Sequence, residues 1–71
     1  MSKEIKSNMA GTVLDLLVKV GDTVSVDQDV VSIESMKMEM MVPSDLGGKV
    51  SELCVAKDDF VQEGQVLIRL D

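Results

Sequence analysis

Short apolar stretches separated by turn residues run through the whole chain. The turn signals are Gly21-Asp22, Asp27-Gln28, Pro43-Ser44-Asp45, Gly47-Gly48, Asp58-Asp59 and Glu63-Gly64. The segments between them are about four to eight residues long, which suits strands and is too short for most helices. Valine and isoleucine, which favour strands, supply 15 of the 71 residues. This pattern predicts strands over 3–7, 12–19, 29–35, 38–42, 49–56 and 66–70, with short pieces around Val24 and Val61.

The alternation of apolar and polar positions slips phase at two places. One slip falls between Val13 and Leu16, and the other between Val50 and Leu53. Such slips suit corners where a strand passes from one sheet to another. Short strands with frequent turns are typical of a sandwich or barrel. We therefore predict an all-β fold, a flattened β-barrel or sandwich of two antiparallel sheets.

The chain also contains an internal duplication. A shift of 37 residues aligns 1–34 with 38–71 without a gap, and glycine, aspartate and glutamine turn positions match. Two such halves are expected to pack face to face about a pseudo-two-fold axis, because each buries what the other cannot bury alone. Four aliphatic residues are expected in or beside one shared core: Val13, Ile33, Val50 and Leu70.

Only Ser35, Met36 and Lys37 lie outside the repeat, at the midpoint of the chain. They join two predicted strands, and a joint of two or three residues is a tight β-hairpin. Lys37 is therefore expected at an exposed tip, whereas the other lysines (Lys3, Lys6, Lys19, Lys49 and Lys57) have ordinary polar settings. The stretch 34–41 also holds four of the six methionines. Exposed thioethers mark adaptable recognition surfaces; the alternative is that these methionines belong to the core.

Composition excludes several kinds of function. Thirteen acidic against seven basic residues give a net charge of −6, which disfavours nucleic-acid binding. The chain has no histidine, so the commonest general base and metal ligand are absent. One small domain of this length has no room for a deep active-site cleft. A lone cysteine and the absence of an apolar signal or membrane segment lead us to expect a cytoplasmic protein without a membrane span, monomeric in isolation.

The hairpin sequence resembles that of a known family. The run Glu34-Ser35-Met36-Lys37-Met38-Glu39 resembles the attachment hairpin of biotinyl domains, which usually reads Glu-(Ala/Ser)-Met-Lys-Met. Further similarity lies in Met9–Val13, Val18–Val24 and Glu63–Leu67, so the resemblance to biotinyl/lipoyl attachment domains spans nearly all of 1–71. It implies a single domain with the barrel-sandwich hybrid fold. Asp27 and Asp58 stand where the family often has glycine, and aspartate tolerates the left-handed conformation better than most residues.

The resemblance also implies a function as a carrier, with no catalytic residue of its own. Lys37 would be the covalent anchor of biotin, attached by a biotin protein ligase that activates the acid as its adenylate. The carrier would then serve a biotin carboxylase and a carboxyltransferase, moving carboxylate between their sites. Recognition by the ligase would fall to residues beside the lysine: Glu34, Ser35, Met36, Met38 and Glu39.

Three alternatives stand beside this hypothesis. A lipoyl carrier shares the fold, but lipoyl domains usually have aspartate before the lysine and a small residue after it, unlike Met36 and Met38. An unmodified scaffold module of the same fold is a second alternative. An enzyme that depends on Cys54 is the third, although that residue is expected to be a small buried hydrophobe. Asp58-Asp59 is expected to form a turn and not a metal site.

Overall fold

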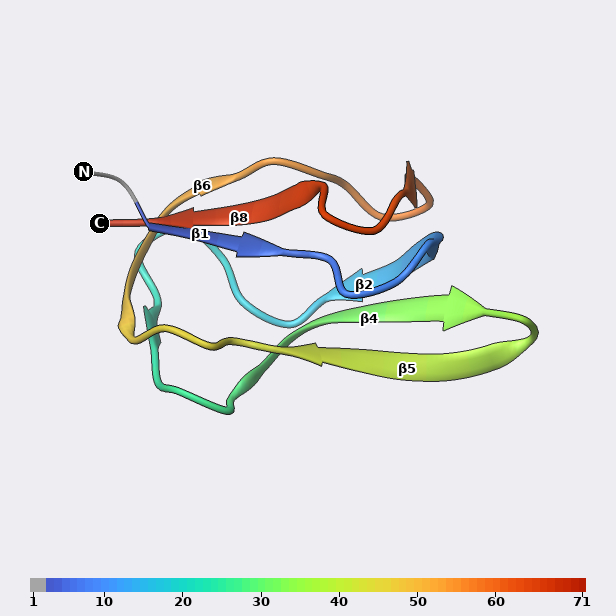
Figure 1. The fold of residues 1–71 in the computed structure, drawn as a ribbon. Helices are drawn as coiled ribbons and strands as arrows, with labels where there is room; N and C mark the ends of the chain where they lie inside the picture. Colours follow the sequence, from blue (N-terminus) through green and yellow to red (C-terminus); the bar gives the residue numbers. More distant parts are fainter. Residues whose placement is uncertain (1–2) are drawn as a thin grey trace.

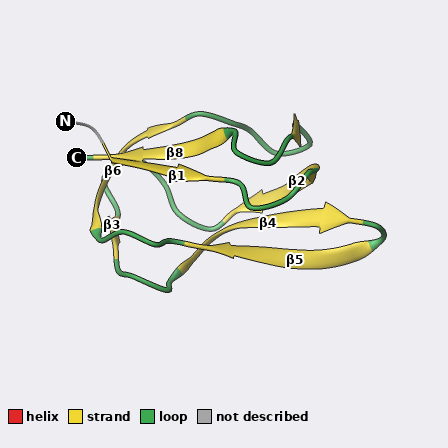
Figure 2. Cartoon of the chain, in the orientation of Figure 1, coloured by secondary structure: helices red, strands yellow, loops and turns green. Residues whose placement is uncertain are grey.

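The computed structural model describes residues 3–71, and strands joined by loops account for all of them (Figure 2). No helix in this range is long and apolar enough to cross a membrane. The strands are β1 (Lys3–Lys6), β2 (Gly11–Leu16), β3 (Thr23–Val24), β4 (Asp29–Ser35), β5 (Met38–Pro43), β6 (Gly48–Leu53), β7 (Phe60–Val61) and β8 (Val66–Leu70). The predicted all-β fold is confirmed.

The strands form two four-stranded sheets in which every pairing is antiparallel. The first sheet has the order β1-β8-β6-β3 and the second has the order β5-β4-β2-β7. A shift of 37 residues converts each strand of the first sheet into its counterpart in the second. Both sheets take strands from both halves of the chain, so neither repeat folds as a separate layer. The structure has the predicted pseudo-two-fold symmetry.

The core repeats this symmetry residue by residue. Every buried hydrophobic residue has a buried partner 37 positions away, and these pairs are Ile5/Val42, Val13/Val50, Val18/Val55, Val24/Val61, Val30/Leu67, Val31/Ile68 and Ile33/Leu70. The four residues predicted for a shared core are all among them. Because all these side chains are aliphatic and most are β-branched, they pack between the pleated sheets without a polar atom to satisfy.

Each half of the chain contains two turns in which one residue has a positive φ, the left-handed conformation. Gly21 and Asp58 occupy one equivalent pair of positions with φ of 97° and 75°, and Asp27 and Gly64 occupy the other with φ of 73° and 87°. Each pair therefore combines one glycine with one aspartate. This confirms the prediction that aspartate is tolerated at these positions. A positive φ costs aspartate less free energy than it costs most residues.

The predicted strands 12–19 and 49–56 are too long. In the structure these strands run over Gly11–Leu16 and Gly48–Leu53. The chain then leaves the sheet, and the backbone N–H of Leu17 donates to the carbonyl of Val30 in one isolated contact. Apolar residues beyond the strand ends pack on the core from loops, which periodicity alone does not distinguish from strand residues.

The two phase slips are β-bulges within a sheet and not corners between sheets. Pairing of β2 with β4 shifts register between Val13 and Asp15, and pairing of β6 with β8 shifts between Val50 and Glu52. One extra residue reverses the side-chain alternation, because the period of a strand is two residues. The expectation of a strand that changes sheets was therefore wrong, whereas the position of each slip was right.

The hairpin of β4 and β5 extends past the rest of the molecule (Figure 1). The protein measures 33 × 18 × 17 Å, and the end of this hairpin lies opposite the end where β1 begins and β8 ends (Figure 1). Because β1 and β5 are equivalent strands of the repeat, the pseudo-two-fold symmetry places the start of β1 and the start of β5 at opposite ends. The hairpin tip is thus remote from the start of β1 and from the end of β8.

Candidate attachment site

The β4–β5 hairpin closes with a loop of two residues. Ser35 and Met38 are the last paired residues, so Met36 and Lys37 form the loop by themselves. Their φ angles are 54° and 63°. Positive φ at both central residues defines a type I′ turn, whose twist matches that of the flanking strands. The structure therefore places Lys37 at the tip of a tight hairpin, where the sequence predicted it.

Neither turn residue is the glycine or asparagine that type I′ turns favour. A left-handed conformation costs an ordinary L-residue about 1–2 kcal/mol. This strain at Met36 and Lys37 was not expected from the sequence, because neither residue type suggests a positive φ. The paired strands below the loop hold the conformation in place. Backbone strain of this kind is typical of functional positions.

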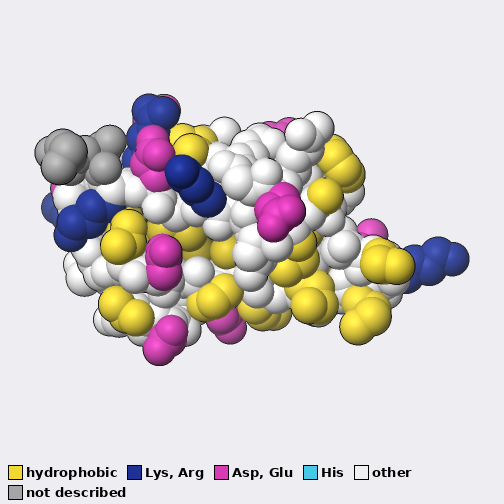
Figure 3. All heavy atoms as spheres, viewed as in Figure 1, with side chains coloured by type: hydrophobic (Ala, Val, Ile, Leu, Met, Phe, Trp, Pro, Cys, Tyr) yellow, Lys and Arg dark blue, Asp and Glu magenta, His cyan; other side chains and the backbone are white. Residues whose placement is uncertain are grey.

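The methionines beside Lys37 point to solvent. Met36 is 91% exposed and Met38 is 61% exposed, although both are large apolar side chains. Hydrophobic side chains gather around the projecting end of the molecule, beside a basic side chain (Figure 3). The alternative that these methionines belong to the core is therefore wrong. Exposed apolar side chains beside one exposed amine form a surface suited to recognition by another protein.

The two glutamates of the predicted recognition set face each other below the tip. Glu34 and Glu39 are Cα partners on β4 and β5, and both are exposed. Like charges directly opposite each other are destabilising. The hydroxyl of Ser32 donates to Glu39 Oε2 at 2.7 Å, which offsets part of that cost and holds Glu39 against β4. Ser35, the remaining residue of the set, is half-buried beside Met38.

Ser32 is the structural residue that the sequence analysis did not find. It is 1% exposed, and its hydroxyl donates a hydrogen bond to Glu39. The equivalent position in the other repeat is Arg69, which bridges Glu4 and Glu52 at 3.5 and 3.2 Å. This break in the repeat was a usable signal, because Ser32 stands opposite a charged residue in the aligned halves. Arg69 makes both of the ion pairs found among residues 3–71. Lys37 therefore makes no ion pair within this range.

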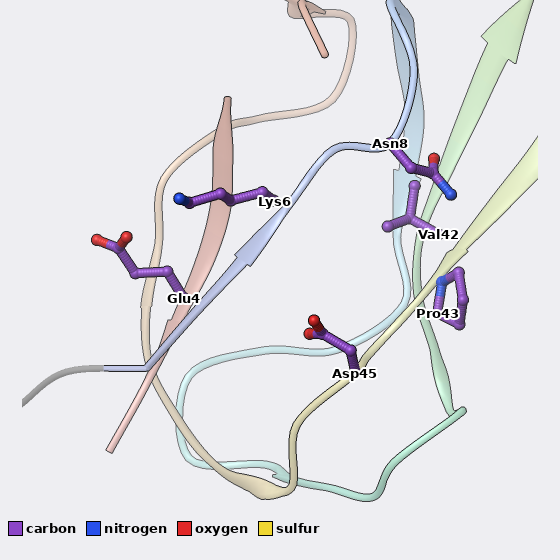
Figure 4. A pocket seen from close by; sticks show the side chains of 6 residues that line it. All are labelled: Glu4, Lys6, Asn8, Val42, Pro43 and Asp45. Carbon is purple, nitrogen blue, oxygen red and sulfur yellow. The ribbon is translucent and has the colours of Figure 1, made fainter. Parts of the chain in front are cut away.

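The surface has a groove of about 400 Å³ (Figure 4). It runs between the edge strands β1 and β5 on the pseudo-two-fold axis. Its lining residues are Glu4, Lys6, Asn8, Val42, Pro43 and Asp45. None of the hairpin-tip residues lines it. Lys37 is exposed at the hairpin tip and does not line this groove.

The remaining candidate residues have structural settings. Cys54 lies just after β6 and is half-buried, which corrects the expectation of full burial. Burial, followed by the nearby charge of Glu52, raises the pKa of its thiol. Asp59 accepts a hydrogen bond at 2.9 Å from the backbone of Ala56, and Asp58 supplies a positive φ in the same turn. No cluster of three metal-ligating side chains occurs among residues 3–71.

Proteins with matching sequences include both biotin and lipoyl carriers. The chain is 41% identical to the biotin/lipoyl attachment protein of Bacillus subtilis, over 93% of this chain and 90% of that protein. It is 42% identical to the biotin carboxyl carrier protein of Streptococcus mutans, over 87% of this chain and 48% of that protein. It is 43% identical to the dihydrolipoyllysine-residue acetyltransferase component of the Azotobacter vinelandii pyruvate dehydrogenase complex, over 86% of this chain but 10% of that protein.

Solved structures with a matching fold also include both a carboxylase and a lipoyl domain. The fold matches part of the Kluyveromyces lactis urea carboxylase with a TM-score of 0.91 and 28% identity, over all of this chain and 6% of that one. It matches the lipoyl domain of the Azotobacter vinelandii 2-oxoglutarate dehydrogenase complex with a TM-score of 0.70 and 32% identity, over 87% of this chain and 78% of that one.

A family model described as "Biotin-requiring enzyme" matches residues 3–70, nearly the whole chain. Domains of this kind carry biotin or lipoate on a lysine and are carriers and not catalysts. The exposed hairpin lysine fits that role. The chain therefore belongs to the biotin/lipoyl attachment domain family.

Proposed function

We propose that the chain is a biotin carrier in which Lys37 holds the cofactor. The observation that carries this proposal is the exposed lysine at the tip of a projecting hairpin, between two exposed methionines. Biotinyl domains usually have methionine on both sides of their lysine, which Met36 and Met38 match. The similarity to a biotin carboxyl carrier protein and to a urea carboxylase supports the same assignment.

The fold gives the carrier two properties. The β4–β5 hairpin rests on a core of aliphatic pairs, so the base of the lysine is fixed. The lysine side chain above it is a flexible stem of four methylene groups. Biotin on that stem would supply a group that carries carboxylate from a biotin carboxylase to a carboxyltransferase. Because the stem tethers it, delivery becomes intramolecular, with an effective concentration of about the millimolar range.

Attachment requires a separate ligase. The chain has no histidine, and the charged residues nearest to Lys37 along the hairpin are Glu34 and Glu39. Only the neutral form of an amine attacks an acyl group, so the reaction needs a base that accepts the amine proton. We propose that a biotin protein ligase supplies both the activated acyl group and the base. Its contacts would fall on Met36 and Met38, with Glu34, Ser35 and Glu39 as polar neighbours.

Lipoate is the second candidate cofactor. The acetyltransferase relative is as similar to this chain as the carboxyl carrier relative, and the Bacillus subtilis relative is named for both cofactors. Lipoyl domains usually have aspartate before the lysine and a small residue after it. The intact mass of the protein from its own host separates the two, because biotin adds a ureido bicycle and lipoate adds a dithiolane. A lipoyl mass alone would reject the biotin assignment, and an unmodified mass would favour a scaffold role.

The methionine contacts give a prediction about specificity. Met36→Asp combined with Met38→Ala is expected to lower the initial rate of biotinylation at least about tenfold. The reason is that an aspartate places an unpaired carboxylate in an apolar contact, at a cost of about 1–3 kcal/mol. The same variant is expected to gain some lipoylation at Lys37. The measurement is the initial rate at subsaturating carrier, with folding checked by circular dichroism.

A matched control uses the next methionine on the same face of β5. Met40→Ala removes an exposed thioether without touching the neighbours of the lysine, and it is expected to leave the rate within about twofold. An unchanged rate in the folded double variant would show that the ligase reads the hairpin backbone and not the methionines.

A further inference from the structure

Four exposed thioethers lie on the hairpin that carries the proposed attachment lysine. The hairpin methionines, Met36, Met38, Met40 and Met41, are 91%, 61%, 39% and 42% exposed. They fall within six consecutive positions of one projecting hairpin (Figures 1 and 3). Met9, by contrast, is partly buried and packs against the core. Four of the five methionines among residues 3–71 thus lie on this hairpin.

The internal repeat shows that the fold does not require methionine at these positions. Lys3 and Glu4 of β1 are the equivalents of Met40 and Met41 of β5, and both strands are the outer strands of their sheets. Charged side chains are the usual protection of an edge strand. β1 follows this rule at these two positions, and β5 does not. The methionines of β5 are therefore not explained by the needs of the sheet.

An accessible thioether reacts with a peroxide by oxygen transfer. A sulfur lone pair attacks one peroxide oxygen, the O–O bond breaks, and the second oxygen leaves as water after taking up a proton. Sulfur loses two electrons and becomes a sulfoxide, and hydrogen peroxide is reduced to water. Cys54 is a poor competitor, because it is half-buried and its raised pKa leaves less of the reactive thiolate.

We propose that the hairpin methionines are an oxidation site for peroxides, and that their sulfoxide state blocks modification of Lys37. The inference rests on the proposed function, since it concerns recognition of the same lysine. Oxidation turns an apolar, flexible side chain into a polar, chiral one. Met36 precedes Lys37 in the two-residue loop and Met38 follows it, so a sulfoxide at either position falls on a residue adjacent to the lysine in sequence. Reductases specific for the two sulfoxide epimers reverse the change.

The first part of the test maps the oxidation. The unmodified protein is treated with hydrogen peroxide, and its peptides are followed over time by mass spectrometry. Met36 and Met38 are expected to gain oxygen first, Met40 and Met41 later, and Met9 last, in the order of their exposure. Oxidation of Met9 as fast as that of the hairpin methionines would overturn the proposal of a site at the tip.

The second part compares biotinylation rates before and after oxidation. The oxidised protein is expected to be modified at least about tenfold more slowly, and treatment with both methionine sulfoxide reductases is expected to restore the rate. The matched control replaces all four residues together (Met36→Leu, Met38→Leu, Met40→Leu and Met41→Leu), which keeps apolar side chains but removes the oxidisable sulfur. It is expected to keep its own rate after peroxide treatment, with folding checked by urea unfolding.

The outcomes separate this inference from the proposed function. Equal rates for oxidised and untreated protein would overturn the inference and leave the carrier function intact. An equal loss of rate in the leucine variant would also overturn it, because the damage would then lie elsewhere. Untreated protein that accepts neither biotin nor lipoate would reject the proposed function, and the switch with it.

Discussion

Lys37→Arg is expected to abolish cofactor attachment while the fold stays unchanged. Arginine keeps the positive charge at the tip but has no primary amine, and its guanidinium does not lose its proton in proteins. The side chain is exposed and makes no ion pair among residues 3–71, so the substitution removes no contact that stabilises the sheet. The measurement is the intact mass after co-expression with a biotin protein ligase, and separately with a lipoate ligase.

The control for this prediction is Lys57→Arg. Lys57 is also exposed and also lies in a turn, but that turn precedes the short strand β7 and not a projecting hairpin. This variant is expected to be modified at the normal rate. Biotin or lipoate on any other lysine of the Lys37→Arg protein would reject the site assignment, because the remaining lysines would then be equally accessible to the ligase.

Truncation of the shared core has the largest expected effect on stability. Ile33→Ala and Leu70→Ala are each expected to lower the free energy of unfolding by about 2–4 kcal/mol. Ile33 of β4 and Leu70 of β8 are equivalent in the repeat, and both are fully buried. Because the two sheets pack on each other through these residues, loss of either side chain leaves a cavity that both halves share. Urea unfolding monitored by circular dichroism measures the change.

A milder core variant and a surface variant serve as controls for this prediction. Ile33→Val removes one methylene group and is expected to cost about 0.5–1.5 kcal/mol, which keeps the protein folded if the alanine variants do not fold. Val26→Ala, at an exposed loop position, is expected to change stability by about 0.5 kcal/mol or less. Hydrogen exchange is expected to show one cooperative unit. Independent opening of residues 3–34 and 38–71 would contradict a core shared by the two halves.

The candidate site was predictable because its signals are local in the sequence. A hairpin tip needs only two strands and a short joint, and the joint between the repeats contains Met36 and Lys37. The strain in this loop was not predictable, because residue type alone gives no sign of a left-handed methionine or lysine. The link between Ser32 and Glu39 was not predictable either. It depends on the register of β4 against β5, which the strand pattern leaves open by one residue.

The sequence by itself determined the strand-rich fold, the duplication, the aliphatic core and the lysine at the centre of the chain. These follow from residue type and spacing, which act over a few neighbouring positions. Only the tertiary structure decided that each sheet mixes strands of both halves, that β2 and β6 bulge instead of changing sheets, and that the methionines of β5 face solvent. The physical reason is that burial depends on what packs against a strand. The β4–β5 hairpin extends past the opposite sheet, so apolar side chains near its tip have no core to enter (Figure 1).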